Sequence, residues 1–206
     1  MNTPTHLLMG AALLSRSRDR WQGSSKSQRW FNALILLGAL IPDLGLFVLF
    51  VWARGILGVS EDQLWSEVYW RANWQTVFTI GNSIPLFGFL LVLGVVFRRY
   101  TWSLYMVGFA SAALIHLAFD LPFHHDDAHA HFWPFTDWRF NSPLSYWDPA
   151  HHGGVMQIIE VTMALGLIAV LWRRFPGNRA LSAVLVVALI SYIAVPVYFT
   201  MMMSTS

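Results

Sequence analysis

Six apolar segments dominate this chain of 206 residues and limit the folds open to it. The first is about ten residues long, whereas each of the other five is close to the length that an α-helix needs to cross a bilayer. Hydrophobic residues make up 56% of the chain and charged residues only 12%. We therefore expect an all-α, polytopic membrane bundle with about five full spans and a short N-terminal re-entrant or partial helix, forming one transmembrane domain over residues 1–206. The segments cover approximately residues 5–14, 32–53, 77–97, 102–121, 155–172 and 180–203.

The basic residues are divided unevenly between the two sides that alternating spans define. Ten of the 13 fall on one side, and only Arg54, Arg71 and Arg139 fall on the other. Because lysine and arginine concentrate on the cytoplasmic side of membrane proteins, the sequence predicts a bacterial inner-membrane protein whose histidine-rich loop faces the periplasm. The ten are Arg16, Arg18, Arg20, Lys26, Arg29, Arg98, Arg99, Arg173, Arg174 and Arg179.

Composition also excludes several classes of function. The chain has no cysteine, which removes disulfides, thiolate nucleophiles and iron–sulfur clusters. Its basic residues are scattered in loops and form no stripe that would follow a phosphate backbone, so we expect no nucleic-acid partner. The expected partners are the lipid bilayer and, if the chain works in a larger complex, other membrane protein subunits.

Two connections on the expected outer side are rich in aromatic residues. Residues 61–75 carry Trp65, Trp70 and Trp74 at near-helical spacing, which is typical of a helix lying in the membrane interface. Residues 122–154 combine histidines and acidic residues with a Trp-Pro-Phe stretch. We expect this second connection to cap the mouth of the bundle.

Histidines and acidic residues are concentrated in one part of the chain. Seven of the eight histidines lie within residues 116–131 and 148–153. Imidazole nitrogens and carboxylate oxygens at this density are the donors that divalent transition metals bind. The sequence therefore predicts a divalent metal cofactor, with Zn²⁺ as the first choice and Mn²⁺ as the second.

Several ionisable residues fall at membrane depth, where they are costly and mark either function or a buried pair. His116 and Asp120 are four residues apart, so they share one face of a helix. If the spans alternate, the other ionisable residues also lie in the outer half of the bundle, and we expect them to converge in one outward-opening cavity. The candidate metal ligands are His6, Asp43, His116, Asp120, His124 and His125, and the candidate catalytic carboxylates are Asp43 and Glu160.

Purely structural explanations stay open for these residues. His116 and Asp120 can simply pair across one helical turn, and Asp43 can satisfy backbone groups that the preceding proline leaves free. His6 can have a capping or packing role. The histidines of residues 124–131 can form a solvated surface loop that chelates metal adventitiously.

Three short motifs resemble those of a known family. They are Thr5-His6-Leu-Leu-Met-Gly10, Pro42-Asp43, and His116-x-x-x-Asp120 ahead of a Trp-Pro-Phe stretch. Over residues 1 to about 135 the chain resembles the membrane-bound metal-dependent hydrolases, which include the YdjM-like inner-membrane proteins. The resemblance implies a metal site that contains His6, Asp43, His116 and Asp120.

The chain departs from the family pattern at two positions. Gly45 stands where the family has the second Asp of Pro-Asp-x-Asp, and Asn82 stands where it has the last His of His-Arg-x-x-Thr-His-Ser. The additional histidines of the outer loops can supply replacement ligands. The chain also resembles sequences labelled cobalamin-biosynthesis CobQ-like, but that chemistry needs a nucleophilic cysteine and a phosphate-binding loop, and this chain has neither.

Three functions are compatible with these residues and with the resemblance. The first is a metal-dependent hydrolase at the outer membrane face that acts on phosphoester or lipid-linked substrates, with Asp43 or Glu160 as general base. The second is a non-catalytic accessory subunit of a larger membrane complex, and the third is a protein that captures metal through its outer loop without chemistry. The aromatic cap favours a formed site over a flexible carrier.

Overall fold

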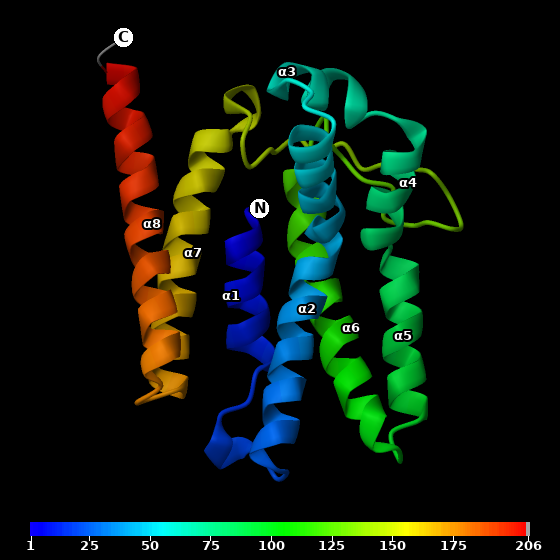
Figure 1. Cartoon of the computed structure of the whole chain (residues 1–206), viewed down its shortest axis with the longest axis vertical. Coiled ribbons are helices and arrows are strands. Elements are labelled where there is room, and N and C mark those ends of the chain that lie inside the picture. Colours follow the sequence, from blue (N-terminus) through cyan, green and yellow to red (C-terminus); the bar gives the residue numbers. More distant parts are fainter. Residues whose placement is uncertain (205–206) are drawn as a thin grey trace.

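The architecture is all-α and polytopic, as the apolar segments predict. The computed structural model describes the backbone of residues 1–204 and the side chains of residues 1–194, and this part of the chain contains helices and loops but no strand (Figure 1). The α-helices are α1 (Thr3–Leu14), α2 (Ser25–Phe50), α3 (Glu61–Gln63), α4 (Ala72–Gly81), α5 (Ile84–Val96), α6 (Thr101–Asp120), α7 (Gly153–Arg174) and α8 (Arg179–Ser204).

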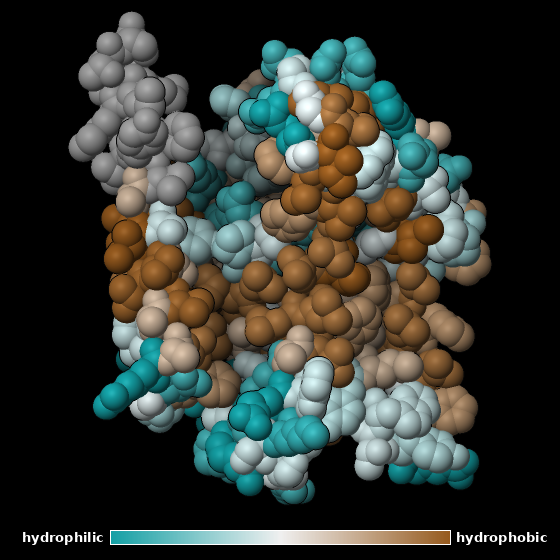
Figure 2. All heavy atoms as spheres, in the orientation of Figure 1, coloured by the Kyte–Doolittle hydropathy of each residue, from teal (hydrophilic) through white to brown (hydrophobic). Residues whose placement is uncertain are grey.

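Four helical stretches are long and apolar enough to cross a membrane. They cover Ser25–Ile56, Ala72–Val96, Thr101–Phe123 and Gly153–Arg174, and Arg179–Ala194 of α8 forms a shorter apolar helix. Figure 2 shows the corresponding belt of hydrophobic residues between two hydrophilic ends. This pattern is the one that a bilayer requires, because an unpaired backbone or polar group in hydrocarbon is costly.

The span over Ala72–Val96 is interrupted where α4 meets α5. Asn82 returns its side-chain amide to the Phe78 carbonyl at 2.9 Å, which satisfies the end of α4. Ser83 caps α5 by accepting a 3.1 Å hydrogen bond from the backbone N–H of Leu86, and Pro85 lies in the first turn of α5, where no backbone donor is needed. The interruption places the side-chain amide of Asn82 next to the Pro42 carbonyl of α2, 3.3 Å away.

The short helix α1 is wedged between α2 and α7 rather than lying at the surface (Figure 1). On one side Leu8 and Ala12 pack against Ala164 and Ile168 of α7. On the other side, Leu7 and Leu14 of α1 pack against buried residues of α2 and α6. This burial fixes the position of α1, so that a polar residue in its first turns faces the interior of the bundle.

The two aromatic-rich connections differ in structure. The expected helix over residues 61–75 is divided: α3 continues into a π-helical stretch at Leu64–Val68, and α4 begins at Ala72. The cap loop between α6 and α7 is irregular, but it is tied down by backbone hydrogen bonds. The N–H of Ile84 donates to the His131 carbonyl at 2.8 Å, and the N–H of Ser142 donates to the His124 carbonyl at 3.0 Å.

Candidate metal centre

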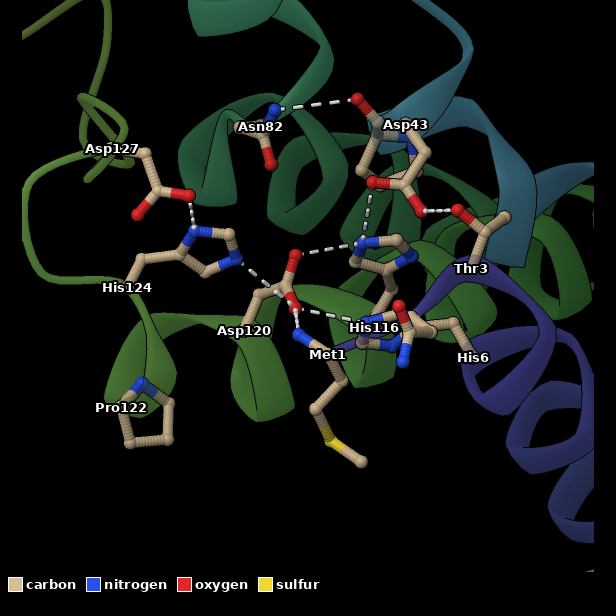
Figure 3. Close-up of polar contacts among 12 residues, drawn as sticks. Met1, Thr3, His6, Asp43, Asn82, His116, Asp120, Pro122, His124 and Asp127 are labelled. Carbon is tan, nitrogen blue, oxygen red and sulfur yellow. Dashed lines mark hydrogen bonds and ion pairs between the residues drawn. The ribbon is translucent and has the colours of Figure 1, made fainter. Parts of the chain in front are cut away.

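His116 and Asp120 lie one turn apart on α6 and are almost fully buried, with 1% and 2% of their surfaces exposed. The Nδ1 atom of His116 is 2.7 Å from the Ala39 carbonyl of α2, and because a carbonyl only accepts, Nδ1 carries the hydrogen. In the neutral ring, Nε2 then directs its lone pair at Asp120, whose Oδ2 is 3.0 Å away (Figure 3). Two lone pairs that face each other at this distance call for a cation or a proton between them.

His6 reaches the same carboxylate from α1. Its ring stacks on the ring of His116 with centroids 3.6 Å apart, and its Nε2 is 2.8 Å from Oδ1 of Asp120. The Nδ1 atom of His6 is buried without a hydrogen-bond partner among the described residues. One donor atom from each of His6, His116 and Asp120 lies within 4.8 Å of the other two. We call these three residues the donor group.

Asp43 lies beside the donor group on α2. Its Oδ1 is 3.5 Å from Nε2 of His116, and its side chain is 19% exposed. Its Oδ2 accepts a 2.5 Å hydrogen bond from the hydroxyl of Thr3 (Figure 3). Asp43 is therefore the carboxylate at the site that both contacts the donor group and is reached by solvent.

A cavity of about 660 Å³ leads to Asp43. Its polar lining includes Asp43, Asn82, His124 and Asp127. The remaining wall is mainly aromatic. Trp65, Tyr69, Trp70, Tyr146 and Trp147 come from the two aromatic-rich connections, and Phe78 comes from α4. An apolar cavity with a few convergent polar groups is the usual form of a small-molecule site.

The comparisons with known proteins identify the family. A family model described as YdjM inner membrane protein matches residues 1–202. The chain belongs to the YdjM inner membrane protein family. No curated protein and no solved structure matches the chain. Membership of the YdjM family and the apolar helices together place the protein in the bacterial inner membrane.

The two positions where this YdjM-family chain departs from the expected motifs both have packing roles. A Cβ atom at Gly45 would lie 3.1 Å from side-chain atoms of Val77 and Phe78, so a larger residue there would press α2 away from α4. The Asn82 side chain bonds to two backbone carbonyls, one on α2 and one on α4. Neither position contributes a donor to the group around Asp120.

Glu160 on α7 holds the start of α1. Its carboxylate accepts hydrogen bonds from the backbone and side chain of Asn2, at 2.8 and 3.1 Å, and from the Thr5 hydroxyl at 2.6 Å. Negative charge at a helix N-terminus is favourable, because the first N–H groups are unpaired there. Among the described residues, Glu160 makes no contact with the donor group. Instead, Glu160 binds the start of α1, the helix that carries His6.

His124 lies at the edge of the donor group. Its Nδ1 is 2.9 Å from Asp127 and its Nε2 is 3.5 Å from Oδ1 of Asp120. Burial opposes a positive charge on His124, but the two carboxylates outweigh burial and raise its pKa to about 9. Burial raises the pKa of Asp127, but the hydrogen bond and charge of His124 lower it more, so this pKa lies below its ordinary value.

His125 points elsewhere. Its Nδ1 donates to the Ser142 carbonyl at 2.5 Å, and its ring stacks on His151 with centroids 3.7 Å apart. The structure thus brings His6, Asp43, His116 and Asp120 together, with His124 at the edge, and leaves His125 apart.

Sequence reasoning missed two contributors at the start of the chain. The amino group of Met1 donates to Oδ1 of Asp120 at 2.7 Å, and the Thr3 hydroxyl orients Asp43. For these two residues the sequence shows only that the neighbouring Pro4 suits the first turn of a helix. Their contacts with α6 and α2 depend on the tertiary position of α1, which no local pattern shows.

Proposed function

We propose that this YdjM-family chain is a membrane-embedded hydrolase that depends on a divalent metal ion and acts on phosphoester or lipid-linked substrates. The supporting observation is the donor group: two imidazoles turn their Nε2 atoms toward one buried carboxylate, at 2.8 and 3.0 Å. Without a metal ion, the single carboxylate faces both rings and the Met1 ammonium group, and it has no hydrogen to donate to the Nε2 lone pair of a neutral His116.

The residues fit a divalent ion in two respects: the type of their donor atoms, and the hydrogen bond that orients one of the histidines. His6, His116 and Asp120 would hold it, which matches the mixed nitrogen and oxygen sets that Zn²⁺ takes in catalytic sites, with Mn²⁺ as the second choice. The hydrogen bond from Nδ1 of His116 to a backbone carbonyl is the outer contact that metal-ligating histidines almost always make. When bound, such an ion polarises an ester oxygen and lowers the pKa of water.

Asp43 is the residue we assign as proton acceptor. The Thr3 hydroxyl occupies its Oδ2, which leaves Oδ1 as the free basic oxygen, and this atom faces His116. Asp43 also lines the cavity through which a substrate would enter. A carboxylate in this position takes a proton from an attacking water molecule during ester hydrolysis.

We infer the orientation in the membrane from the basic residues. Arg98 and Arg99 lie between α5 and α6, and Arg173, Arg174 and Arg179 lie between α7 and α8, at the end opposite the donor group. Because positive charge concentrates in the cytoplasm, the cavity and the cap loop would face the periplasm.

The test is hydrolysis by the purified full chain after metal removal and reloading. Bis-p-nitrophenyl phosphate and nanodiscs of phosphatidylethanolamine and phosphatidylglycerol serve as substrates. The wild type reloaded with Zn²⁺ or Mn²⁺ should release p-nitrophenol or a lipid head group, and chelation should abolish the release. Asp43→Asn should lower the rate by about 100-fold or more, which is the typical effect of losing a general base.

Either of two results would contradict the proposal. The first is that the reloaded protein hydrolyses neither substrate, and the second is that its rate stays the same after chelation and in Asp43→Asn. Asp126→Asn is the matched control, because Asp126 also lines the cavity but is not among the residues that contact the donor group. Its rate should stay close to that of the wild type.

A further inference from the structure

Two further cavities follow α1 on the side of the bundle that faces lipid. One of about 470 Å³ lies between α1, α7 and α8, and one of about 390 Å³ continues along α1 toward its C-terminal end. The two cavities share Pro4, Val184 and Ala188 in their walls, so they form one groove. The groove is open because α8 packs mainly on α7 and not on α2 (Figure 1).

The groove adjoins the candidate metal centre through one shared wall residue. Asn2 lines both the cavity at Asp43 and the nearer part of the groove. The side chain of Asn2 is fixed at this junction by a 3.1 Å hydrogen bond to Glu160, which also lines the groove. An amphiphile lying in the groove would therefore place its polar end next to the donor group.

The polarity of the groove changes along its length. The part next to the site contains the polar residues Asn2, Gln157, Glu160, Ser191 and Tyr192. The part farther along α1 is lined mainly by aliphatic side chains, and polar residues return only at its far end with Ser15, Asn32 and Asn178. This sequence of a polar end followed by an apolar channel matches a lipid with its head group at the site and its hydrocarbon chain along α1.

We propose that this groove holds the hydrocarbon chain of a membrane lipid whose head group reaches the candidate metal centre. The identification of that lipid as the substrate rests on the proposed function. At membrane depth the competing occupant of an apolar groove is bulk lipid, not water. The wall shared with the site at Asn2, and the larger number of polar residues at that end of the groove, are what select a bound lipid in this orientation.

The test is photo-crosslinking of the full chain in nanodiscs of phosphatidylethanolamine and phosphatidylglycerol that contain phosphatidic acid with a diazirine in its acyl chain. Val187 lines the groove and is 64% exposed, so Val187→Trp fills the groove without entering the packed core. Val186, one residue earlier on α8, lines neither cavity. Val186→Trp is therefore the matched control.

The wild type and Val186→Trp should be labelled mainly at groove residues of α1, α7 and α8. Labelling there should fall about tenfold in Val187→Trp, since overfilling an occupied space costs about one decade in binding. Equal labelling of the outward faces of all helices, or groove labelling that Val187→Trp leaves unchanged, would overturn the proposal. Metal content is measured on the same samples: groove labelling in a protein that binds no metal would support the lipid site and reject the hydrolase.

Discussion

At the scale of single residues, the site depends on hydrogen bonds that decide which atoms are free. The Ala39 carbonyl takes the Nδ1 hydrogen of His116 and so leaves Nε2 available to Asp120. The Thr3 hydroxyl donates to one oxygen of Asp43 and so leaves the other oxygen available. Outer contacts of this kind typically change metal affinity or activity by about 10- to 100-fold when they are lost.

Glu160→Gln tests how far the site depends on the anchoring of α1. The amide cannot accept all of the hydrogen bonds that Asn2 and Thr5 donate, so the variant should lose about 1–3 kcal/mol of stability. Thermal unfolding in detergent, followed by tryptophan fluorescence, measures this change. Glu61→Gln is the control, because Glu61 is exposed. An unfolding temperature equal to that of the wild type would show that Glu160 does not hold α1.

The residues of the site differ in how well the sequence predicts them. His116 and Asp120 are predictable because their spacing alone puts them on one helical face. His6 and Asp43 follow from the alternation of spans. The partner of Glu160 does not follow, because Thr5 is 155 residues away along the chain and the pairing arises only when α1 packs against α7. The separation of His125 from its neighbour His124 is likewise a property of the folded loop.

At the scale of elements, the close approach of α2 and α6 sets the position of the donor group. A Cβ atom at Gly38 would lie 2.1 Å from the Phe109 carbonyl, a distance that backbone atoms cannot accommodate without moving apart. The neighbouring residue Ala39 provides the carbonyl that binds His116. Helix packing and the orientation of the histidine are therefore coupled.

Gly38→Ala should destabilise the protein by about 1–3 kcal/mol, because it overpacks the α2–α6 contact, and should weaken metal binding by moving the Ala39 carbonyl. Gly88→Ala is the matched control, since a Cβ atom there meets nothing within 4 Å and alanine favours the helix. Unfolding temperature and metal affinity are measured for both. Equal values for the two variants would contradict the coupling.

The elements themselves were predictable where hydropathy alone decides them. Each apolar segment is largely helical, apart from the short break at Asn82 and Ser83. That break, and the division of residues 61–75 before Ala72, were not predicted, because a hydropathy pattern does not show where side chains replace backbone hydrogen bonds.

At the scale of the whole molecule, the short helix α1 distinguishes this bundle from a simple array of spans. It is surrounded by longer helices (Figure 1), and its first turns carry the buried His6 into the interior. The alternation of spans and the distribution of basic residues predict this overall arrangement. The lipid groove is not predictable, because α1 forms it together with α7 and α8, which lie at the opposite end of the sequence.

The absence of cysteine makes the orientation directly testable. Asp137→Cys places a thiol at an exposed position of the cap loop, and Gln22→Cys places one in the exposed connection between α1 and α2. A membrane-impermeant maleimide should label the first in intact spheroplasts and the second only after permeabilisation. The reverse labelling pattern would place the cavity in the cytoplasm.

The central claim is that the donor group binds a divalent metal, and metal content tests it most directly. Elemental mass spectrometry of the detergent-purified wild type should find about one equivalent of Zn²⁺ or Mn²⁺. His116→Ala and Asp120→Asn should each lose it, whereas His125→Ala should keep it, because His125 lies apart from the group. Metal content that is absent from the wild type, or unchanged in both donor-group variants, would contradict the account.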